Sequence, residues 1–354
     1  MKIFITGASG YVGEMLVERF LERSDIEEVI GLDVADTTDK LKQNSKYTFI
    51  LGNMADDVWQ EEVKKHNPDV VVHTAWWIRD WFFNRKEHYR WNVVGSEKIF
   101  DFVFSNPSVK KLVYFSTVSS YGAFKENKVD KFFTEDMPFR KVPYNYAEEK
   151  RFAEISLEQK FKEAKEKMGE NTPKVAILRP AAITGSRGRY LRNRFGLQSA
   201  LSGNLKGGIA YKIVTLLTAV VPATRTWFRQ FIHEDDVYGI VERISLGDYS
   251  FEYEAFNISP PGRIVDSKDM AESVGKKVLY LHPYIVRFAF FFTWTLSLGK
   301  IPTSKGAWKF YSYPLIVDGS KITKLLGYKY FTDSYHAFKD TAGYYEKFLP
   351  KKSL

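Results

Sequence analysis

Short runs of apolar, β-branched residues alternate with amphipathic stretches over residues 1–120. The runs are short and bounded by polar or glycine residues, which is typical of buried strands, and the stretches between them have helical spacing. Strands that alternate with helices predict an α/β fold with a doubly wound parallel sheet. The predicted strands are Lys2–Thr6, Glu28–Asp33, Tyr47–Leu51, Asp69–His73, Lys111–Phe115, Lys174–Arg179 and Ala255–Ile258.

A glycine-rich turn, residues 7–13, follows the first strand and leads into an amphipathic stretch. This order places backbone N–H groups and a helix N-terminus against a pyrophosphate. Gly7 would allow the tight turn, Gly10 the approach of the phosphates, and Gly13 the packing of helix on strand. The spacing is G-x-x-G-x-x-G rather than the commoner G-x-G-x-x-G, so an ordinary loop with three glycines is the alternative.

An acidic residue, Asp33, ends the second strand twenty residues after Gly13. A carboxylate there accepts hydrogen bonds from an adenosine ribose and repels a 2′-phosphate. No arginine follows it closely. The pattern favours NAD over NADP, and the alternative is an exposed aspartate at a strand end.

Tyr146 and Lys150 stand four residues apart. On a helix they share one face, so the ammonium would lie near the phenol, whose ordinary pKa is about 10. Lowering that pKa to near 7 requires about 4 kcal/mol of phenolate stabilisation, which an ammonium and a cationic nicotinamide ring could supply. The pair alone is a weak signal, and the alternative is two residues on a solvated helix face.

Residues 75–91 contain four tryptophans and follow the fourth strand. Ligands of doubly wound sheets bind beyond the carboxyl ends of the strands. The segment therefore predicts an apolar substrate pocket, with packing beneath a second domain or a dimer contact as equal alternatives. Residues 116–122 place hydroxyl groups after the fifth strand, where a substrate oxygen would be held.

The strand–helix alternation stops over residues 186–228. Arginine makes forked contacts to phosphate, so the arginines there favour a substrate diphosphate, with a solvated charged surface as the alternative. They are Arg187, Arg189, Arg192, Arg194 and Arg225, followed by Arg229.

The net charge of +9 favours anionic small-molecule partners. The surplus forms no dense basic tail, which argues against nucleic acid. There is no cysteine, so disulfides and thiolate nucleophiles are excluded, and we predict no metal site. The first residues already form a strand, so we expect no cleavable signal peptide and a cytoplasmic protein.

Two apolar stretches, Ile209–Val221 and Tyr284–Leu298, are each interrupted by a basic residue. Both fall short of the roughly twenty residues that span a bilayer. We expect them to be buried helices, and an interfacial membrane contact is the alternative.

Taken in order, these segments resemble the extended short-chain dehydrogenase/reductases, the family of NAD-dependent epimerases and dehydratases. The resemblance covers residues 1–258. It rests on T-G-A-S-G-Y-V-G, the aspartate at 33, H-T-A, N-V-V-G, F-S-T-V-S-S-Y-G, Y-A-E-E-K, L-R-P-A-A-I-T-G and F-I-H-E-D-D-V.

The resemblance implies a role for particular positions. Tyr146 would be the general acid/base, Lys150 would bind the nicotinamide ribose and tune Tyr146, and Thr117 would hold the substrate oxygen. His233 and His73 are expected to be structural. The implied NAD-binding residues are Gly7, Ser9, Gly10, Tyr11, Val12, Gly13, Asp33, Asn53, Met54, Thr74, Ala75, Asn92, Ser116, Tyr146, Lys150, Pro180 and Ile183. The implied substrate residues are Trp76, Trp77, Thr117, Arg187 and Arg225.

The implied fold is a Rossmann sheet, formed by residues 1–183 and 229–258. A smaller mixed substrate-binding domain would comprise residues 184–228 and 259–354. The implied reaction is hydride transfer between a substrate C–H and the nicotinamide C4. A homodimer is a family tendency.

Departures from the family pattern reduce the number of reactions that the chain is expected to catalyse. Val118 and Ser119 replace the Asp-Glu pair of sugar 4,6-dehydratases, which argues against dehydration. A nucleotide-sugar epimerase or oxidoreductase is the first interpretation. The alternative is an NAD(P)-dependent dehydrogenase or reductase that acts on an apolar, steroid- or isoprenoid-like alcohol or ketone. Such an enzyme could be associated with a membrane. A non-catalytic NAD-binding scaffold is a third interpretation, which the intact Thr117, Tyr146 and Lys150 set disfavours.

Overall fold

The computed structural model describes residues 1–187, 220–273, 275–339 and 342–348. The chain divides into two compact units, each described by itself below. The first comprises residues 1–117, 146–179 and 238–256, and the second comprises residues 118–145, 180–237 and 257–354.

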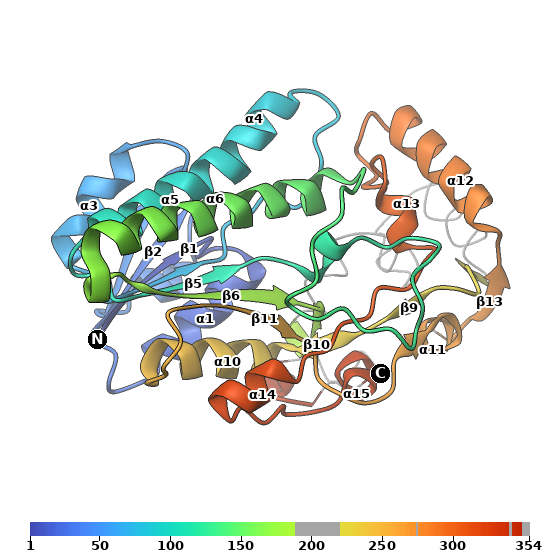
Figure 1. Cartoon of the computed structure of the whole chain (residues 1–354). Helices are drawn as coiled ribbons and strands as arrows, with labels where there is room; N and C mark the ends of the chain where they lie inside the picture. Colours follow the sequence, from blue (N-terminus) through green and yellow to red (C-terminus); the bar gives the residue numbers. More distant parts are fainter. Residues whose placement is uncertain (188–219, 274, 340–341, 349–354) are drawn as a thin grey trace. The chain divides into compact units, whose positions relative to one another are not determined.

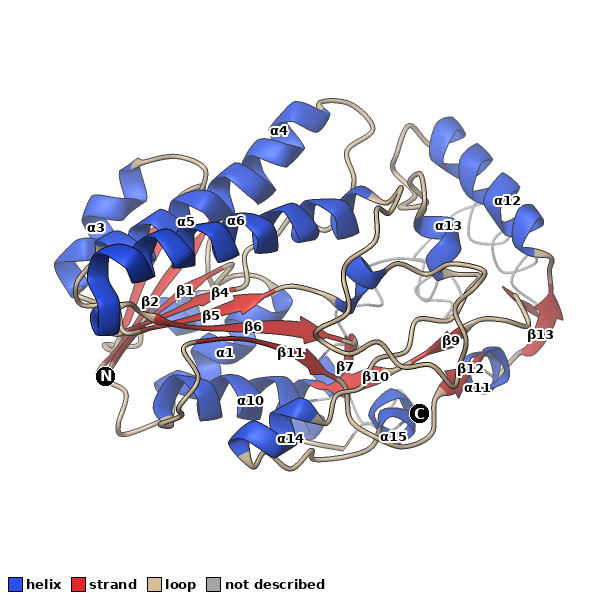
Figure 2. Ribbon diagram, viewed as in Figure 1, coloured by secondary structure: helices blue, strands red, loops and turns tan. Residues whose placement is uncertain are grey.

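A seven-stranded sheet forms the centre of the first unit, which confirms the predicted doubly wound fold (Figure 2). The neighbouring strands from β3 (Tyr47–Leu51) through β1 (Lys2–Thr6) to β6 (Lys174–Pro180) pair in parallel, and the order of the strands along the chain reverses at β1. Ligands of such sheets bind at that switch point. In spatial order the strands are β3 (Tyr47–Leu51), β2 (Glu28–Asp33), β1 (Lys2–Thr6), β4 (Val70–His73), β5 (Lys111–Phe115), β6 (Lys174–Pro180) and β11 (Tyr253–Ile258).

Helices cover both faces of this sheet (Figure 1). One face carries α3 (Val58–His66), α5 (Gly95–Ser105) and α6 (Asn145–Met168), and the other carries α1 (Tyr11–Leu21) and α10 (Glu234–Leu246). On the second face, the Arg19 guanidinium lies 4.0 Å from the centroid of the Tyr238 ring, which ties α1 to α10.

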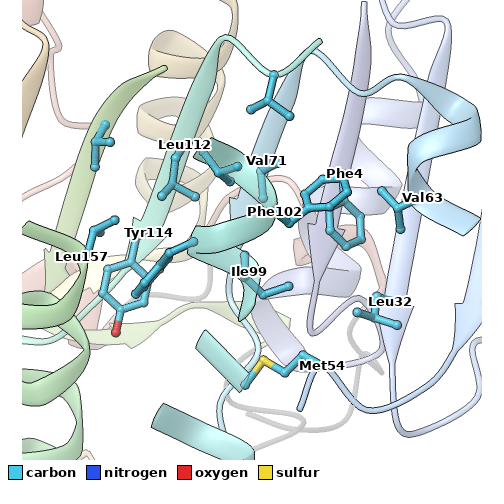
Figure 3. Close-up of a cluster of buried hydrophobic side chains, with 14 of the residues drawn as sticks. Phe4, Leu32, Met54, Val63, Val71, Ile99, Phe102, Leu112, Tyr114 and Leu157 are labelled. Atoms are coloured by element: carbon cyan, nitrogen blue, oxygen red, sulfur yellow. The ribbon is translucent and has the colours of Figure 1, made fainter. Parts of the chain in front are cut away.

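Apolar side chains fill the space between the sheet and α3, α5 and α6 (Figure 3). The Phe4 ring centroid lies 5.7 Å from that of Trp59 and 6.0 Å from that of Phe102, so a strand and two helices meet at one aromatic cluster. β4 is buried along its whole length, as expected of a continuous apolar run covered on both sides. This packing fixes the carboxyl ends of the central strands.

The described residues of the second unit form three small sheets and short helices, in agreement with the predicted mixed domain. β7 (Ala182–Thr184) pairs with β10 (Phe231–His233), β8 (Val220–Ala223) with β13 (Lys277–Tyr280), and β9 (Phe228–Arg229) with β12 (Val265–Asp266). The helices are α11 (Ser267–Glu272), α12 (Pro283–Leu296), α13 (Ala307–Phe310), α14 (Lys321–Leu326) and α15 (Ser334–Lys339).

One expectation about the apolar stretches is wrong. Residues 284–296 are helical within α12, but Val286 is the single buried residue of that helix, and several large apolar side chains face outward. Most of the other stretch, 209–219, lies outside the described residues. No helix in the described ranges is long and apolar enough to cross a membrane.

Candidate active site

The turn after β1 is built as its glycine pattern predicts. Gly7 has a φ of 72°, a left-handed conformation that residues with a Cβ rarely adopt. A Cβ on Gly7 would also meet the backbone of Ala75 at 2.7 Å, and a Cβ on Gly13 would stand 1.9 Å from the Gly7 carbonyl oxygen. Gly10, which precedes α1, is exposed, so the N-terminus of that helix is open to a ligand.

Asp33 lies at the carboxyl end of β2, beside the glycine turn. Its carboxylate accepts hydrogen bonds from the N–H groups of Ser9 (3.0 Å) and Ala35 (2.9 Å), so the backbone holds it in place. The hydroxyl oxygens of Ser9 and of Ser116, which follows β5, are buried and have no hydrogen-bond partner among the described residues. Because an unpaired buried hydroxyl is costly, both oxygens suit a polar ligand.

The loops after β3 and β4 are fixed by local hydrogen bonds. Asn53 Oδ1 accepts a hydrogen bond from the Ala55 N–H at 2.9 Å, and Thr74 Oγ1 donates to the Thr6 carbonyl oxygen at 2.7 Å. Thr74 therefore ties the loop after β4 to the end of β1, whereas the Asn53 hydrogen bond fixes the loop after β3.

The three predicted catalytic side chains come together at the start of α6. The Thr117 hydroxyl is hydrogen-bonded to the Tyr146 hydroxyl. Lys150 lies one turn further along the helix. Its ammonium donates to the carbonyl oxygen of Phe115, the last residue of β5. Both helical side chains are thus tied to one short segment, 115–117.

Aromatic rings surround the Lys150 ammonium. Lys150 is buried, and its Nζ lies 3.7 Å from the centroid of the Trp76 ring and 4.9 Å from that of Tyr114. Cation–π attraction offsets part of the desolvation of the charge. The sequence predicts Trp76 as a substrate residue, and its contact with Lys150 was not foreseen.

Burial determines the direction of the pKa shifts in this cluster. Desolvation raises the pKa of Tyr146 above its ordinary 10.0, and the hydrogen bond with Thr117 opposes the rise. Desolvation also lowers the pKa of Lys150 well below 10.5, against the attraction of Glu154 and Glu149. The Lys150 ammonium is directed at Phe115 and the aromatic rings. The lowered pKa expected for Tyr146 depends on a cationic nicotinamide ring as well as on Lys150, so it stays a prediction.

A buried network beside Lys150 was also not foreseen. Glu149 contacts His88 Nδ1 at 3.0 Å and accepts a hydrogen bond from Asn92 Nδ2 at 2.8 Å. The amide of Asn92 also binds the backbone N–H and carbonyl of Trp77, at 2.8 and 3.1 Å. Asn92 lies in a π-helical turn, Arg90–Val94, which directs its side chain inward. The amide thus fastens the segment after β4 to α6.

The protonation of His88 depends on this network. Burial alone would lower the pKa of His88, but the hydrogen bond and charge of Glu149 outweigh it and raise the pKa above 6.5. The other ring nitrogen, Nε2, lies 3.1 Å from the carbonyl oxygen of Arg79. By contrast, His73 is bonded to Thr6 and Ser96 at both nitrogens, and burial lowers its pKa well below 6.5.

The tryptophans of residues 75–91 pack mainly on one another. The ring centroids of Trp77, Trp81 and Trp91 are 5.3–5.7 Å apart in edge-to-face arrangements. Trp81 also contacts the His88 ring at 5.8 Å. The aromatic cluster is therefore part of the support for the Glu149 network.

Several predicted residues belong to the second unit. Pro180 ends β6, and Ile183 lies in β7 opposite Ile232 of β10. The Arg187 N–H donates to Glu234 at 2.9 Å, and the Arg225 guanidinium lies 4.4 Å from the centroid of the Tyr280 ring. Arg189, Arg192 and Arg194 lie outside the described residues.

Arg229 and His233, also in the second unit, contact the protein's own backbone. Arg229 is directed at backbone carbonyl oxygens, among them those of Phe310 and Tyr313, and its burial lowers the pKa of the guanidinium to about 10. His233 is buried, and its Nδ1 accepts a hydrogen bond from the Asp235 N–H. No cluster of His, Asp and Glu in the described part of the chain could hold a metal ion.

The parallel sheet, the glycine turn at its switch point and the acid at the end of β2 define a Rossmann-type domain. The chain belongs to the NAD dependent epimerase/dehydratase family, whose sequence profile matches residues 3–258.

Curated relatives match parts of the chain. A UDP-glucose 4-epimerase of Streptococcus mutans is 30% identical over 126 residues, which are 34% of this chain and 37% of that protein. An uncharacterized protein of Mycobacterium tuberculosis is 25% identical over 273 residues, 75% of this chain and 64% of its own length. The matches thus cover less than two thirds of either relative.

Solved structures share the fold over nearly the whole chain. A dTDP-glucose 4,6-dehydratase from Bacillus anthracis in complex with NAD has a TM-score of 0.68 and 18% identity, covering 98% of this chain and 97% of that one. A UDP-glucuronic acid 4-epimerase from Bacillus cereus, in complex with UDP-glucuronic acid and NAD, has a TM-score of 0.67 and 18% identity, covering 96% and 98%.

Proposed function

We propose that the chain is an NAD-dependent epimerase or oxidoreductase in which Tyr146 is the general acid/base. The observation that carries the proposal is the convergence of Tyr146, Thr117 and Lys150 on the end of β5. A hydroxyl beyond the end of β5, with a phenol and an ammonium one helical turn apart on α6, can hold a substrate oxygen and move its proton. Family membership supports the same chemistry.

The residues of the first unit fit NAD. The open N-terminus of α1 suits a pyrophosphate, and the backbone-held carboxylate of Asp33 suits the two hydroxyls of an adenosine ribose. The unpaired hydroxyls of Ser9 and Ser116 are polar groups that such a ligand would satisfy. NAD, when bound, supplies the hydride acceptor and the positive charge of its oxidised ring.

The protein's own groups then handle the proton. Thr117 holds the substrate oxygen, and Tyr146 takes or returns its proton. Because burial raises the pKa of Tyr146, the phenolate forms only when positive charge stands close by. Glu149 and Glu154 favour the charged form of Lys150 and oppose the desolvation that lowers its pKa, and an oxidised nicotinamide ring would add a second positive charge.

For the substrate, we propose a nucleotide sugar. The net charge of +9 and the exposed Arg225 favour an anionic ligand, and the relatives named above include enzymes of nucleotide sugars. Val118 and Ser119 lack the carboxyl groups needed for elimination, so epimerisation or oxidation is favoured over dehydration. The alternative, an apolar alcohol or ketone, is supported by the aromatic side chains of residues 75–91.

The test is a substrate screen with purified protein and NAD, comparing UDP- and GDP-sugars with steroid and terpenoid alcohols. NADH absorbance detects oxidation, and chromatography of the sugar detects epimerisation. Turnover of a nucleotide sugar is the expected result. Turnover of sterols alone would replace the first substrate class by the second. Binding of NAD without turnover of any compound would favour the non-catalytic scaffold.

A further inference from the structure

Most large apolar side chains of α12, the helix labelled in Figure 1, are exposed. Tyr284, Ile285, Phe288, Phe291 and Leu296, called here the α12 face, are 66%, 53%, 65%, 62% and 81% exposed. A helix that is apolar all round is ordinarily buried in a protein core or a membrane. An exposed apolar surface of this kind is unusual on a protein in water and indicates a binding surface.

The opposite side of α12 is anchored to the second unit. Val286 is buried, and the Phe290 ring lies 5.0 Å from that of Tyr311. Thr303 Oγ1 donates to the Phe290 carbonyl oxygen at 3.1 Å, and the Arg287 guanidinium lies 5.8 Å from the centroid of the Trp308 ring. These contacts hold the helix in one orientation about its axis, so the α12 face is presented as a fixed surface.

The sequence around α12 contains no acidic residue. Between Glu272 and Asp318 there is no aspartate or glutamate, although the chain has 43 of them. The same interval carries six basic residues, and those that are exposed precede, lie within or follow α12 along the chain. The exposed ones are Lys277, Arg287, Lys300 and Lys305.

The length of α12 limits what can cover its face. Its fourteen residues extend about 21 Å, which is short of the ~30 Å hydrocarbon core of a bilayer. A helix of this kind lies along the interface, with its apolar side chains among the acyl chains and its basic neighbours at the headgroups. A second copy fits less well, because a two-fold contact would bring two acid-free basic surfaces together.

We propose that the α12 face and its flanking lysines form a docking surface for membranes that contain anionic phospholipids. The inference goes beyond the proposed function and does not depend on it. It adds a location at which the enzyme would work, whatever its substrate.

The experiment is co-sedimentation of the full chain with vesicles. One set is phosphatidylcholine alone, and the other contains equal amounts of phosphatidylcholine and phosphatidylserine. We expect binding to the mixed vesicles, weakened by added salt and by the absence of phosphatidylserine. The double variant Phe288→Ser/Phe291→Ser should bind about tenfold or more weakly, because two exposed rings no longer enter the acyl region.

Matched variants separate this surface from general effects. Phe132→Ser/Val58→Ser removes two exposed apolar side chains elsewhere and should bind as the parent does. Lys300→Glu/Lys305→Glu should lose binding, whereas Lys128→Glu/Lys131→Glu, with the same change in net charge, should retain most of it.

Three outcomes would overturn the proposal. The first is no sedimentation of the parent protein with mixed vesicles. The second is equal binding by the parent and Phe288→Ser/Phe291→Ser. The third is a parent protein that binds no vesicles and is a dimer in analytical ultracentrifugation, while the Phe288→Ser/Phe291→Ser variant is a monomer. That result would assign the α12 face to contact with a second copy of the chain. Circular dichroism of each variant shows that the fold is kept.

Discussion

The substitution Glu149→Gln tests whether Glu149 is the partner that keeps His88 charged. The carboxylate contacts His88 Nδ1 and Asn92 Nδ2, and its charge raises the pKa of His88 against the effect of burial. A group whose folded pKa is raised contributes stability below its unfolded pKa, and that contribution is lost as the pH rises through the folded pKa. The effect of Glu149→Gln should therefore be largest in acid.

The hydrogen-bond geometry gives the magnitudes. In acid, His88 carries protons on both nitrogens, and a glutamine amide cannot pair its charge, so the free energy of unfolding should fall by about 3 kcal/mol. In alkali, neutral His88 can donate from Nε2 to the Arg79 carbonyl oxygen and accept the glutamine N–H at Nδ1. The glutamine oxygen still accepts from Asn92, so the loss should be within about 1 kcal/mol.

The assay is denaturant unfolding of both proteins at about pH 5.5 and about pH 9, with NMR titration of the histidines. The control is Glu148→Gln on the same helix, which removes a carboxylate paired with Arg151 near the surface and should change stability by about 1 kcal/mol or less at either pH. An equal loss for Glu149→Gln at both pH values, or a larger loss in alkali, would refute the reasoning.

Three further predictions concern the first unit. Burial lowers the pKa of Lys150, so the unfolded chain binds more protons than the folded one as the pH approaches 10.5. The free energy of unfolding of the parent, relative to that of Lys150→Met, should therefore rise with pH in denaturant unfolding. A difference that stays constant with pH would contradict the lowered pKa. Gly13→Ala places a Cβ against the Gly7 carbonyl oxygen. It should lower the free energy of unfolding by about 2 kcal/mol or more and abolish NAD binding in calorimetry. The control Gly169→Ala, whose Cβ would meet nothing within 4 Å, should leave NAD binding unchanged. Asp33→Asn should improve the affinity for NADP relative to NAD by about tenfold, and an unchanged ratio would reject the role of this carboxylate.

The sequence predicts those parts of the fold that depend on local spacing. The alternation of apolar runs with amphipathic stretches is sufficient for the parallel sheet. Gly7 and Gly13 are required by the tight turn after β1, where a Cβ would meet neighbouring backbone atoms. The four-residue spacing of Tyr146 and Lys150 is enough to place both on one face of α6. Such features are set by neighbours along the chain, so periodicity and residue type are enough.

Contacts between distant segments were not predictable in this way. His88 and Glu149 are 61 residues apart, and Asn92, which binds the same carboxylate, lies in a π-helical turn that residue spacing does not reveal. The contact of Trp76 with Lys150 likewise joins a loop to a distant helix. The composition of α12 predicts burial, whereas its exposure depends on which other elements are available to cover it.

The most direct test of the central claim compares Tyr146→Phe with Tyr144→Phe, a matched change two residues earlier. NAD affinity from calorimetry and turnover of the substrate found by the screen would be measured for both variants and the parent. The account predicts that Tyr146→Phe binds NAD nearly as the parent does and loses turnover by about 10²–10⁴-fold, while Tyr144→Phe keeps most of its turnover. Undiminished turnover by Tyr146→Phe would contradict the account.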